Sequence, residues 1–247
     1  MAAAIEPKST PPDRLIVTID GPAGTGKSSV AASLAERLGL ELLDTGAMYR
    51  AATALALDHA VPLDNERAVA DLAERASLRF AWNASPPMLT AFAADITHRL
   101  READVTASVS VVAAHPAVRT AMVESQRRIG REHPRLLSEG RDQGSVVFPD
   151  ADVKFYLDAE PRIRAERRAA QLREAGVRAD VDAVEVQLRE RDRLDASRAV
   201  SPLRCPDDAI CVDTTSLEED AVVDLLEHHV RAQLADPHRT EPSTPAH

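Results

Sequence analysis

Short apolar runs alternate along the chain with longer stretches in which apolar residues recur every three to four positions. The short runs are typical of buried strands, and the longer stretches are typical of amphipathic helices. Strands that alternate with helices predict an α/β fold, with a mainly parallel sheet covered by helices on both faces. The pattern predicts strands at 15–19, 42–43, 136–138, 153–157 and 209–212, and helices over 26–38, 46–57, 66–76, 116–131 and 217–235.

Residues 78–93 follow a different pattern. They alternate between apolar and polar positions and carry Phe80, Trp82 and Phe92 around the turn-forming stretch 83–87. Alternation broken by a turn predicts a small β-ribbon rather than another core strand. We therefore expect an insert here, outside the main sheet.

The two ends of the chain are rich in Pro, Ser and Thr and poor in large apolar residues. Such segments bury too little apolar surface to offset the entropy lost on ordering, so we expect disordered tails at 1–13 and 236–247 around one domain at 14–235. No stretch approaches the ~18 to 20 apolar residues of a membrane helix, and the amino terminus lacks the apolar core of a signal peptide. These features predict a soluble, cytoplasmic protein.

The net charge of −10 changes which ligands the chain can hold. Binding to a nucleic acid polymer or a membrane surface needs a broad basic field, so we expect neither partner. An anionic ligand must instead meet a local cluster of cations. One candidate is the segment 160–198, where ten arginines lie among nine acidic residues. The alternative for this segment is a solvated helical face with ion pairs between positions i and i+4.

Cys205 and Cys211 are the two cysteines of the chain. Their spacing does not match that of metal ligands, and no feature of the sequence indicates an oxidising compartment. We therefore expect two ordinary reduced thiols without a metal ion.

The sequence GPAGTGKS, at 21–28, matches the phosphate-loop pattern GxxxxGK followed by Ser or Thr. It lies between a predicted strand and a predicted helix, which is the context that this motif requires. Its glycines allow the backbone N–H groups to surround the ATP β-phosphate, Lys27 would bridge the β- and γ-phosphates, and Ser28 would bind Mg²⁺. The predicted ATP-binding residues here are Gly21, Pro22, Ala23, Gly24, Thr25, Gly26, Lys27, Ser28 and Ser29.

A phosphate loop identifies the phosphoryl donor and leaves the acceptor open. The chain has neither the NKxD loop with which GTPases read guanine nor the long apolar strand ending in a DE pair that is typical of motor ATPases. A kinase for a small molecule becomes the leading class. Two further motifs, DTGAMYR at 44–50 and EGRDQG at 139–144, follow predicted strands at the edge where ligands bind in such sheets.

Four stretches, taken in order, resemble the successive signatures of bacterial cytidylate kinases. They are GPAGTGKS, DTGAMYR, GRDQG followed by VVFPDADVKFYLDA, and RDRLDASRAVSPL, and the resemblance covers about 15–234. It implies a P-loop α/β core with an insert that binds the nucleoside monophosphate, at about 62–101, and a lid at about 160–198. The implied reaction transfers the γ-phosphoryl group of ATP, with Mg²⁺, to CMP or dCMP.

The resemblance also implies roles for individual residues. Ser110, Arg119 and Asp142 would hold the cytosine ring, and Arg191 and Asp195 would hold the sugar. Thr45, Arg50, Arg141 and Arg198 would bind the acceptor phosphate; Lys27, Arg141 and Arg198 would act in catalysis. Two departures from the family pattern are mild: Thr45 stands where serine is frequent, and Gln143 where methionine is frequent.

Three arginines of the proposed lid, Arg164, Arg167 and Arg168, have helical spacing and would close together over ATP. The alternative is that they form ion pairs with acidic neighbours in the same helix (Glu160, Glu166 and Glu174). Two other functions stay open for the whole chain. One is a kinase for UMP or shikimate, and the other is a nucleotide-binding regulatory module without turnover. We expect a monomer.

Overall fold

The computed structural model describes residues 13–84 and 87–235, so the predicted tails lie almost entirely outside the described residues. Five strands form the main sheet in the order β2-β6-β1-β7-β8, and every neighbouring pair is parallel. The predicted parallel sheet is therefore confirmed; four strands are one to three residues longer than expected, and β8 is shifted by one residue. The strands are β1 (Leu15–Asp20), β2 (Glu41–Asp44), β6 (Arg135–Gly140), β7 (Val153–Asp158) and β8 (Ile210–Asp213).

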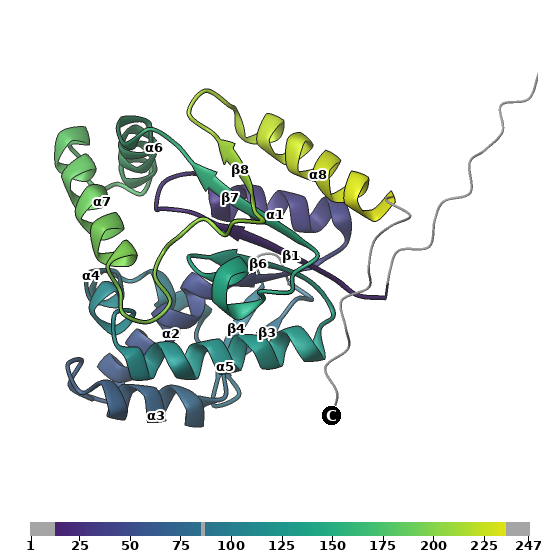
Figure 1. Cartoon of the computed structure of the whole chain (residues 1–247). Helices are drawn as coiled ribbons and strands as arrows, with labels where there is room; N and C mark the ends of the chain where they lie inside the picture. The colour runs from purple at the N-terminus through teal and green to yellow at the C-terminus, as the bar shows by residue number, and fades with distance from the viewer. Residues whose placement is uncertain (1–12, 85–86, 236–247) are drawn as a thin grey trace, which may run out of the picture.

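Helices cover both faces of this sheet (Figure 1), which confirms the predicted layers. The two faces follow from the alternation of side chains along a strand. In the central strand β1, Val17 packs with α1 and α8, and its neighbour Ile16 packs on the opposite face with α2 and α5. The helices are α1 (Lys27–Leu38), α2 (Thr45–Asp58), α5 (Pro116–Glu132) and α8 (Glu219–Ala235).

The predicted β-ribbon is present as a separate antiparallel sheet of three short strands, β3 (Arg79–Ala81), β4 (Met88–Ala91) and β5 (Ala94–Asp95). It follows α3 (Glu66–Ala76). Trp82 connects the ribbon to the core, because its Nε1 donates to the carbonyl of Leu42 at 2.7 Å and its ring packs on Phe80. The aromatic residues of this segment thus anchor an insert.

One helix was not predicted. Residues Ala103–Val112 form α4, after a short 3₁₀ helix, η1 (Thr97–Arg101). Its sequence, ADVTASVSVV, is rich in β-branched and hydroxyl residues that have low helix propensity. Burial of Val105, Val109 and Val112, which recur with helical spacing, outweighs that propensity.

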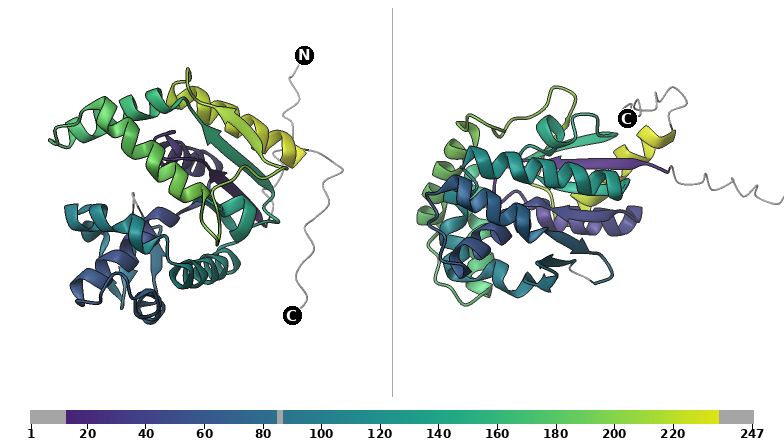
Figure 2. Two further views of the ribbon diagram at one scale, coloured as in Figure 1. Left: turned by 60° about the vertical axis from the view of Figure 1, so that its left-hand side comes forward. Right: turned by 90° about the horizontal axis from the view of Figure 1, so that it is seen from below.

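The arginine-rich segment forms an antiparallel pair of helices, α6 (Pro161–Glu174) and α7 (Val181–Ala196). The pair has a small apolar cluster of its own, in which Ala165 and Ala169 of α6 pack against Val184 and Leu188 of α7. It stands across from the part of the chain that contains α3 and α4 (Figure 2, left). The chain then returns from α7 to β8 through a long connection.

Candidate functional site

The glycine-rich motif folds as a tight loop between β1 and α1. Gly21, Gly24 and Gly26 have φ angles of 144°, 84° and 88°, which side chains other than glycine rarely adopt. Gly21 is restricted further, because a Cβ there would lie 2.0 Å from the carbonyl oxygen of Leu157 in β7. Helix α1 begins at Lys27, so the unbonded N–H groups of its first turn face the loop. The loop therefore has the geometry that the motif predicts for a phosphate site.

Lys27 is buried inside this loop. Its Nζ donates to the carbonyl of Pro22 at 2.5 Å and lies 3.4 Å from the hydroxyl of Thr25. Burial lowers the pKa of Lys27, and the positive charge of Arg141 lowers it further. A bound polyanion would offset both effects, so the lysine is placed for a phosphate group.

Arg164 of α6 joins the phosphate loop to the helical pair. Its Nη1 donates to the carbonyl of Ala23 at 3.1 Å and to Asp192 of α7 at 2.5 Å. Its Nε donates to the carbonyl of Ala159. The Arg164 side chain is buried. If residue 24 carried a Cβ, that atom would lie 3.0 Å from the Cβ of Arg164. Arg164 thus fixes the outer wall of the loop.

The three arginines of α6 that are expected over ATP contact different parts of the protein, and their approach to ATP stays a prediction. Arg167 donates to the backbone oxygens of Thr214 and Leu217, and Arg168 donates to Gln171. Side chains three or four positions apart on a helix lie on the same side but still point in somewhat different directions. Each of these arginines therefore contacts a different part of the protein. The alternative pairings with acidic neighbours in α6 are also not the contacts that Arg164, Arg167 and Arg168 make. Contact of Arg167 with ATP stays a prediction.

The surface of α6 and α7 does carry the ion pairs that the alternative interpretation proposed. Arg162 pairs with Glu166 and Arg189 with Glu185 at i, i+4 spacing, and Arg193 pairs with Glu190 at i, i+3 spacing; all three arginines are exposed. Arg173 and Arg178 are exposed as well, whereas Arg164 is buried and Arg191 and Arg198 are partly buried. The cluster is therefore divided between a solvated face and a partly buried one.

Arg119 and Asp142, both predicted to read the base, meet as a buried ion pair. Nη2 of Arg119 lies 2.6 Å from Oδ2 of Asp142, and each residue is only 2% exposed. Arg119 comes from the first turn of α5, and Asp142 follows β6, 23 residues later. The guanidinium also lies 5.3 Å from the centre of the Tyr49 ring and donates to the carbonyl of Ala113.

Asp195 of α7 connects two arginines predicted to bind phosphate. Its Oδ2 accepts from Nε of Arg141 at 3.0 Å, and its Oδ1 accepts from Arg198. A cavity of about 590 Å³ lies beside it, between α4 and α7. Four of the predicted substrate residues line this cavity, namely Ser110, Arg191, Asp195 and Arg198.

Cations of the donor and acceptor sides lie close enough to repel one another. Burial lowers the pKa of Arg191 to about 10, and the charge of Arg141 contributes to that decrease. Arg141 and Arg191 also lower the pKa of Lys27 in the phosphate loop. Arg50, which donates to Thr106 and to the carbonyl of Leu100, has a pKa lowered by burial. Such a concentration of positive charge is a site for an anion with several charges.

Thr45 has a different contact from the one expected. Its hydroxyl donates to the carbonyl of Glu139 at 2.7 Å, and the Glu139 carboxylate accepts from Ser28 at 2.9 Å. These contacts tie the start of α2 and the phosphate loop to the end of β6. The role of Thr45 at the acceptor phosphate stays a prediction.

A family model described as cytidylate kinase matches residues 17–232. The chain belongs to the cytidylate kinase family. Three curated cytidylate kinases are similar to it over most of both chains. The one from Aeromonas salmonicida is 40% identical over 221 residues, which is 90% of this chain and 96% of that protein. The one from Pseudomonas paraeruginosa is 43% identical over 220 residues (88% and 96%), and the one from Rhodococcus jostii is 46% identical over 213 residues (86% and 93%).

The resemblance indicated by the motifs is thus confirmed. Among solved structures, that of an uncharacterised protein from Eubacterium ventriosum is similar in fold. Its TM-score is 0.51 at 12% identity, and the match covers 89% of this chain and 99% of that one. At this identity the likeness concerns the fold alone.

Two carboxylates of this cytidylate kinase family member were not singled out from the sequence. Asp20, the last residue of β1, accepts from the N–H groups of Gln143 at 2.8 Å and Gly144 at 2.7 Å. It is 1% exposed, and burial raises its pKa to about 6. Glu139 is buried as well, and burial and the nearby Asp44 raise its pKa. The signal available in the sequence was an acidic residue close to the carboxyl end of a predicted strand.

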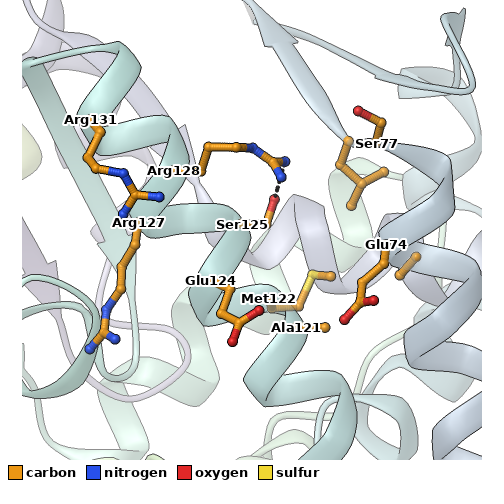
Figure 3. A pocket seen from close by; sticks show the side chains of 11 residues that line it. Glu74, Ser77, Ala121, Met122, Glu124, Ser125, Arg127, Arg128 and Arg131 are labelled. Carbon is orange, nitrogen blue, oxygen red and sulfur yellow. Dashed lines mark hydrogen bonds between the residues drawn. The ribbon is translucent and has the colours of Figure 1, made fainter. Parts of the chain in front are cut away.

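A second cavity, of about 580 Å³, lies between α3 and α5 (Figure 3). Its wall combines Glu74, Met122 and Arg128, and Arg128 donates to Ser125 within the cavity at 3.1 Å. None of the residues that the cytidylate kinase motifs identify lines it. Residues of those motifs lie instead along the loop at 21–28 and in the cavity beside α7.

Proposed function

We propose that the chain transfers the γ-phosphoryl group of ATP to CMP or dCMP and so forms ADP and CDP or dCDP. One observation carries this proposal. Lys27 of the phosphate loop lies in the field of Arg141 and Arg191, which belong to the acceptor side. Two phosphate-bearing molecules that meet there, end to end, bring the negative charge that this cluster lacks. The family relatives, which are cytidylate kinases, support the identity of the acceptor.

The ATP phosphates would occupy the loop at 21–28, where the backbone N–H groups and Lys27 hold them. Transfer of a phosphoryl group passes through a loose transition state that needs little help from a general base. Its charge needs stabilisation by fixed cations, and arginine suits the phosphate oxygens because its planar fork donates in pairs. We assign this role to Arg141 and Arg198, which Asp195 already holds in place.

The base would lie where Arg119 and Asp142 meet. The Asp142 carboxylate would accept from the N4 amino group of cytosine, and Arg119 with Ser110 would donate to its N3 and O2 edge. Because Asp142 is already paired and buried before the nucleotide arrives, its orientation costs little on binding. Arg191 and Asp195 would hold the sugar.

Mg²⁺ fits the donor set beside the loop. The hydroxyl of Ser28 and the carboxylate of Glu139 lie 2.9 Å apart, and Asp44 is close enough to raise the pKa of Glu139. Hydroxyl and carboxylate oxygens, with water, are the ligands that Mg²⁺ prefers. The ion would offset the charge of the transferring phosphoryl group. Ser28 would bind it directly, and Glu139 would orient the ligands around it.

We further propose that residues 62–101 form the insert that recognises the monophosphate and that 160–198 form a lid. Supporting the lid, α6 and α7 pack mainly on each other and contact the rest of the site through polar bonds from Arg164 and Asp195. Closure would bring Arg191 onto the acceptor and exclude water. Action as a cytoplasmic monomer belongs to the same proposal.

The test is ADP formation by the full chain with MgATP and a panel of acceptors: CMP, dCMP, UMP and shikimate. We expect fast ADP formation that depends on CMP or dCMP. Turnover with UMP or shikimate alone would assign another kinase. Tight binding of nucleotide without ADP formation by any acceptor would assign a regulatory module.

A further inference from the structure

We infer that Cys205 and Cys211 form a reversible intramolecular disulfide when the protein meets an oxidant, and that this bond restrains the proposed lid. The inference goes beyond the proposed kinase activity, and neither cysteine belongs to the proposed nucleotide sites. The two Sγ atoms lie 2.6 Å apart in the structure, although both cysteines are free thiols. Pairing therefore needs only a small adjustment of the side chains.

The approach of the two thiols is built into the local fold. Between them the chain makes a turn in which the N–H of Ala209 donates to the carbonyl of Pro206 at 3.1 Å. Asp208 fixes this turn to β7 through an ion pair of 2.6 Å with the buried Lys154. Cys211 lies in β8, at one edge of the sheet, in register with Tyr156. The thiols thus face each other because the backbone is held on both sides.

The chemistry balances as thiol–disulfide exchange with a low-molecular-weight disulfide as oxidant. The thiolate of Cys211, the more exposed residue, attacks one sulfur of the oxidant and forms a mixed disulfide with it, while the other sulfur leaves as a thiol. Cys205 then attacks Sγ of Cys211 and releases the second thiol. One Sγ–Sγ bond has formed, the oxidant has been reduced to two thiols, and these carry the two protons of the cysteines. Burial and the hydrogen bond to Cys211 raise the pKa of Cys205 to about 12, which lowers its thiolate fraction, so the second step depends on the closeness of the two sulfur atoms.

The position of the bond gives it a mechanical effect. Residues 197–209 connect α7 to β8 and run across the sheet (Figure 1). Within this connection, the N–H of Leu203 donates to the carbonyl of Asp195 at 2.9 Å, so the end of α7 moves with it. A bond from Cys205 to β8 shortens the part of the connection that is free to move. If α7 must open to release product, oxidation slows turnover.

The experiment treats the full-length protein with oxidised glutathione and then removes the reagent. We expect both thiols to disappear from a thiol titration, with a mass lower by two hydrogen atoms. Trypsin digestion of the denatured product keeps both cysteines in one peptide, 205–231, so the loss is located directly. On the native protein, trypsin cleavage after the exposed Arg204 should slow, and kcat with MgATP and CMP should fall at least about threefold, both restored by dithiothreitol.

The control variants are Cys205→Ser, Cys211→Ser and the double variant. Because the chain has no other cysteine, none of the three should lose kcat through an internal disulfide under the same treatment. Persistent mixed disulfides with glutathione, a bond between two molecules on a non-reducing gel, or unreacted thiols would each overturn the inference. So would an internal disulfide that leaves both Arg204 cleavage and kcat unchanged. The thiol titration and mass do not depend on kinase activity, so failure of the proposed function is recognised separately.

Discussion

Arg119 of α5 and Asp142 after β6 are joined by a 2.6 Å ion pair in the interior of the protein, at the proposed base site. Because the two charges compensate each other, a substitution of Asp142 also affects Arg119. Replacement of Asp142 by alanine would leave a buried guanidinium uncompensated, which commonly costs about 3 to 5 kcal/mol of stability. The isosteric Asp142→Asn keeps the shape and changes only charge and hydrogen-bond direction.

We predict that Asp142→Asn lowers the ratio of kcat/KM for CMP to that for UMP by at least about tenfold, the value of one buried hydrogen-bond mismatch. Cytosine presents an amino donor where uracil presents an oxygen, and the Asn amide can donate to that oxygen. Steady-state kinetics with both acceptors measure the ratio. If both substrates lose activity in equal proportion, Asp142 supports Arg119 and does not read the base.

Lys27→Ala tests the phosphate loop. We expect kcat to fall by several orders of magnitude, because the lysine charge acts mainly on the transferring phosphoryl group. CMP binding, measured by calorimetry, should persist, since the acceptor contacts come from other elements. Near-normal kcat in a folded variant would remove the loop from the mechanism.

Asp195→Asn tests the acceptor side of α7. Loss of the carboxylate releases Arg141 and Arg198, so kcat/KM for CMP should fall at least about tenfold while KM for ATP stays within about twofold. The matched control is Glu190→Gln, since Glu190 lines the same cavity but pairs at the surface with Arg193. A rise confined to the ATP KM would show that α7 serves the other nucleotide.

Arg164→Met tests a positioning residue. Without the guanidinium, Ala23 loses a donor and the loop loses its connection to Asp192, so KM for ATP should rise about tenfold or more. KM for CMP should change less, and Arg164→Lys should restore little, because one ammonium cannot replace the three bonds of the fork. Arg162→Met, on the same helix but at the surface, is the control. Equal effects of the two methionine variants would contradict a specific role.

Asp20 gives a prediction for stability against pH. Its pKa is about 6 in the folded protein against an ordinary value of 3.8, so the folded state holds the proton more tightly. The resulting stabilisation is complete below the ordinary value and is lost as the pH rises through about 6. Denaturant unfolding should show the advantage of wild type over Asp20→Asn falling by about 2 kcal/mol from about pH 4 to about pH 7. Parallel curves would refute the shifted pKa.

The sheet, its covering helices and the phosphate loop follow from the sequence, because period and motif act locally. Pro116 marked the start of α5, and GPAGTGKS marked the loop between β1 and α1. Helix α4 could not be predicted in this way. Ser and Val in ADVTASVSVV have low helix propensity, and tertiary packing of the buried valines outweighs it.

The contacts between residues within the site could not be predicted from the sequence, for a different reason. The motifs identified Arg119 and Asp142 separately, but no local pattern shows that they pair with each other. The same holds for Arg164, whose spacing with Arg167 suggested a shared ligand, whereas its contacts lie on the loop and on α7. Contacts between residues far apart in the chain depend on how the elements pack.

The concentration of cations around Lys27, Arg141 and Arg191 has a practical consequence for the unliganded protein. Such a cluster does not distinguish a nucleotide phosphate from any other tetrahedral oxyanion of similar charge. Inorganic phosphate and sulfate are therefore competitors for the empty cleft, and buffers that contain them raise the apparent KM of both nucleotides. They also protect the resting protein against heat by binding its folded state. Affinities are best compared in buffers with monovalent, weakly bound anions.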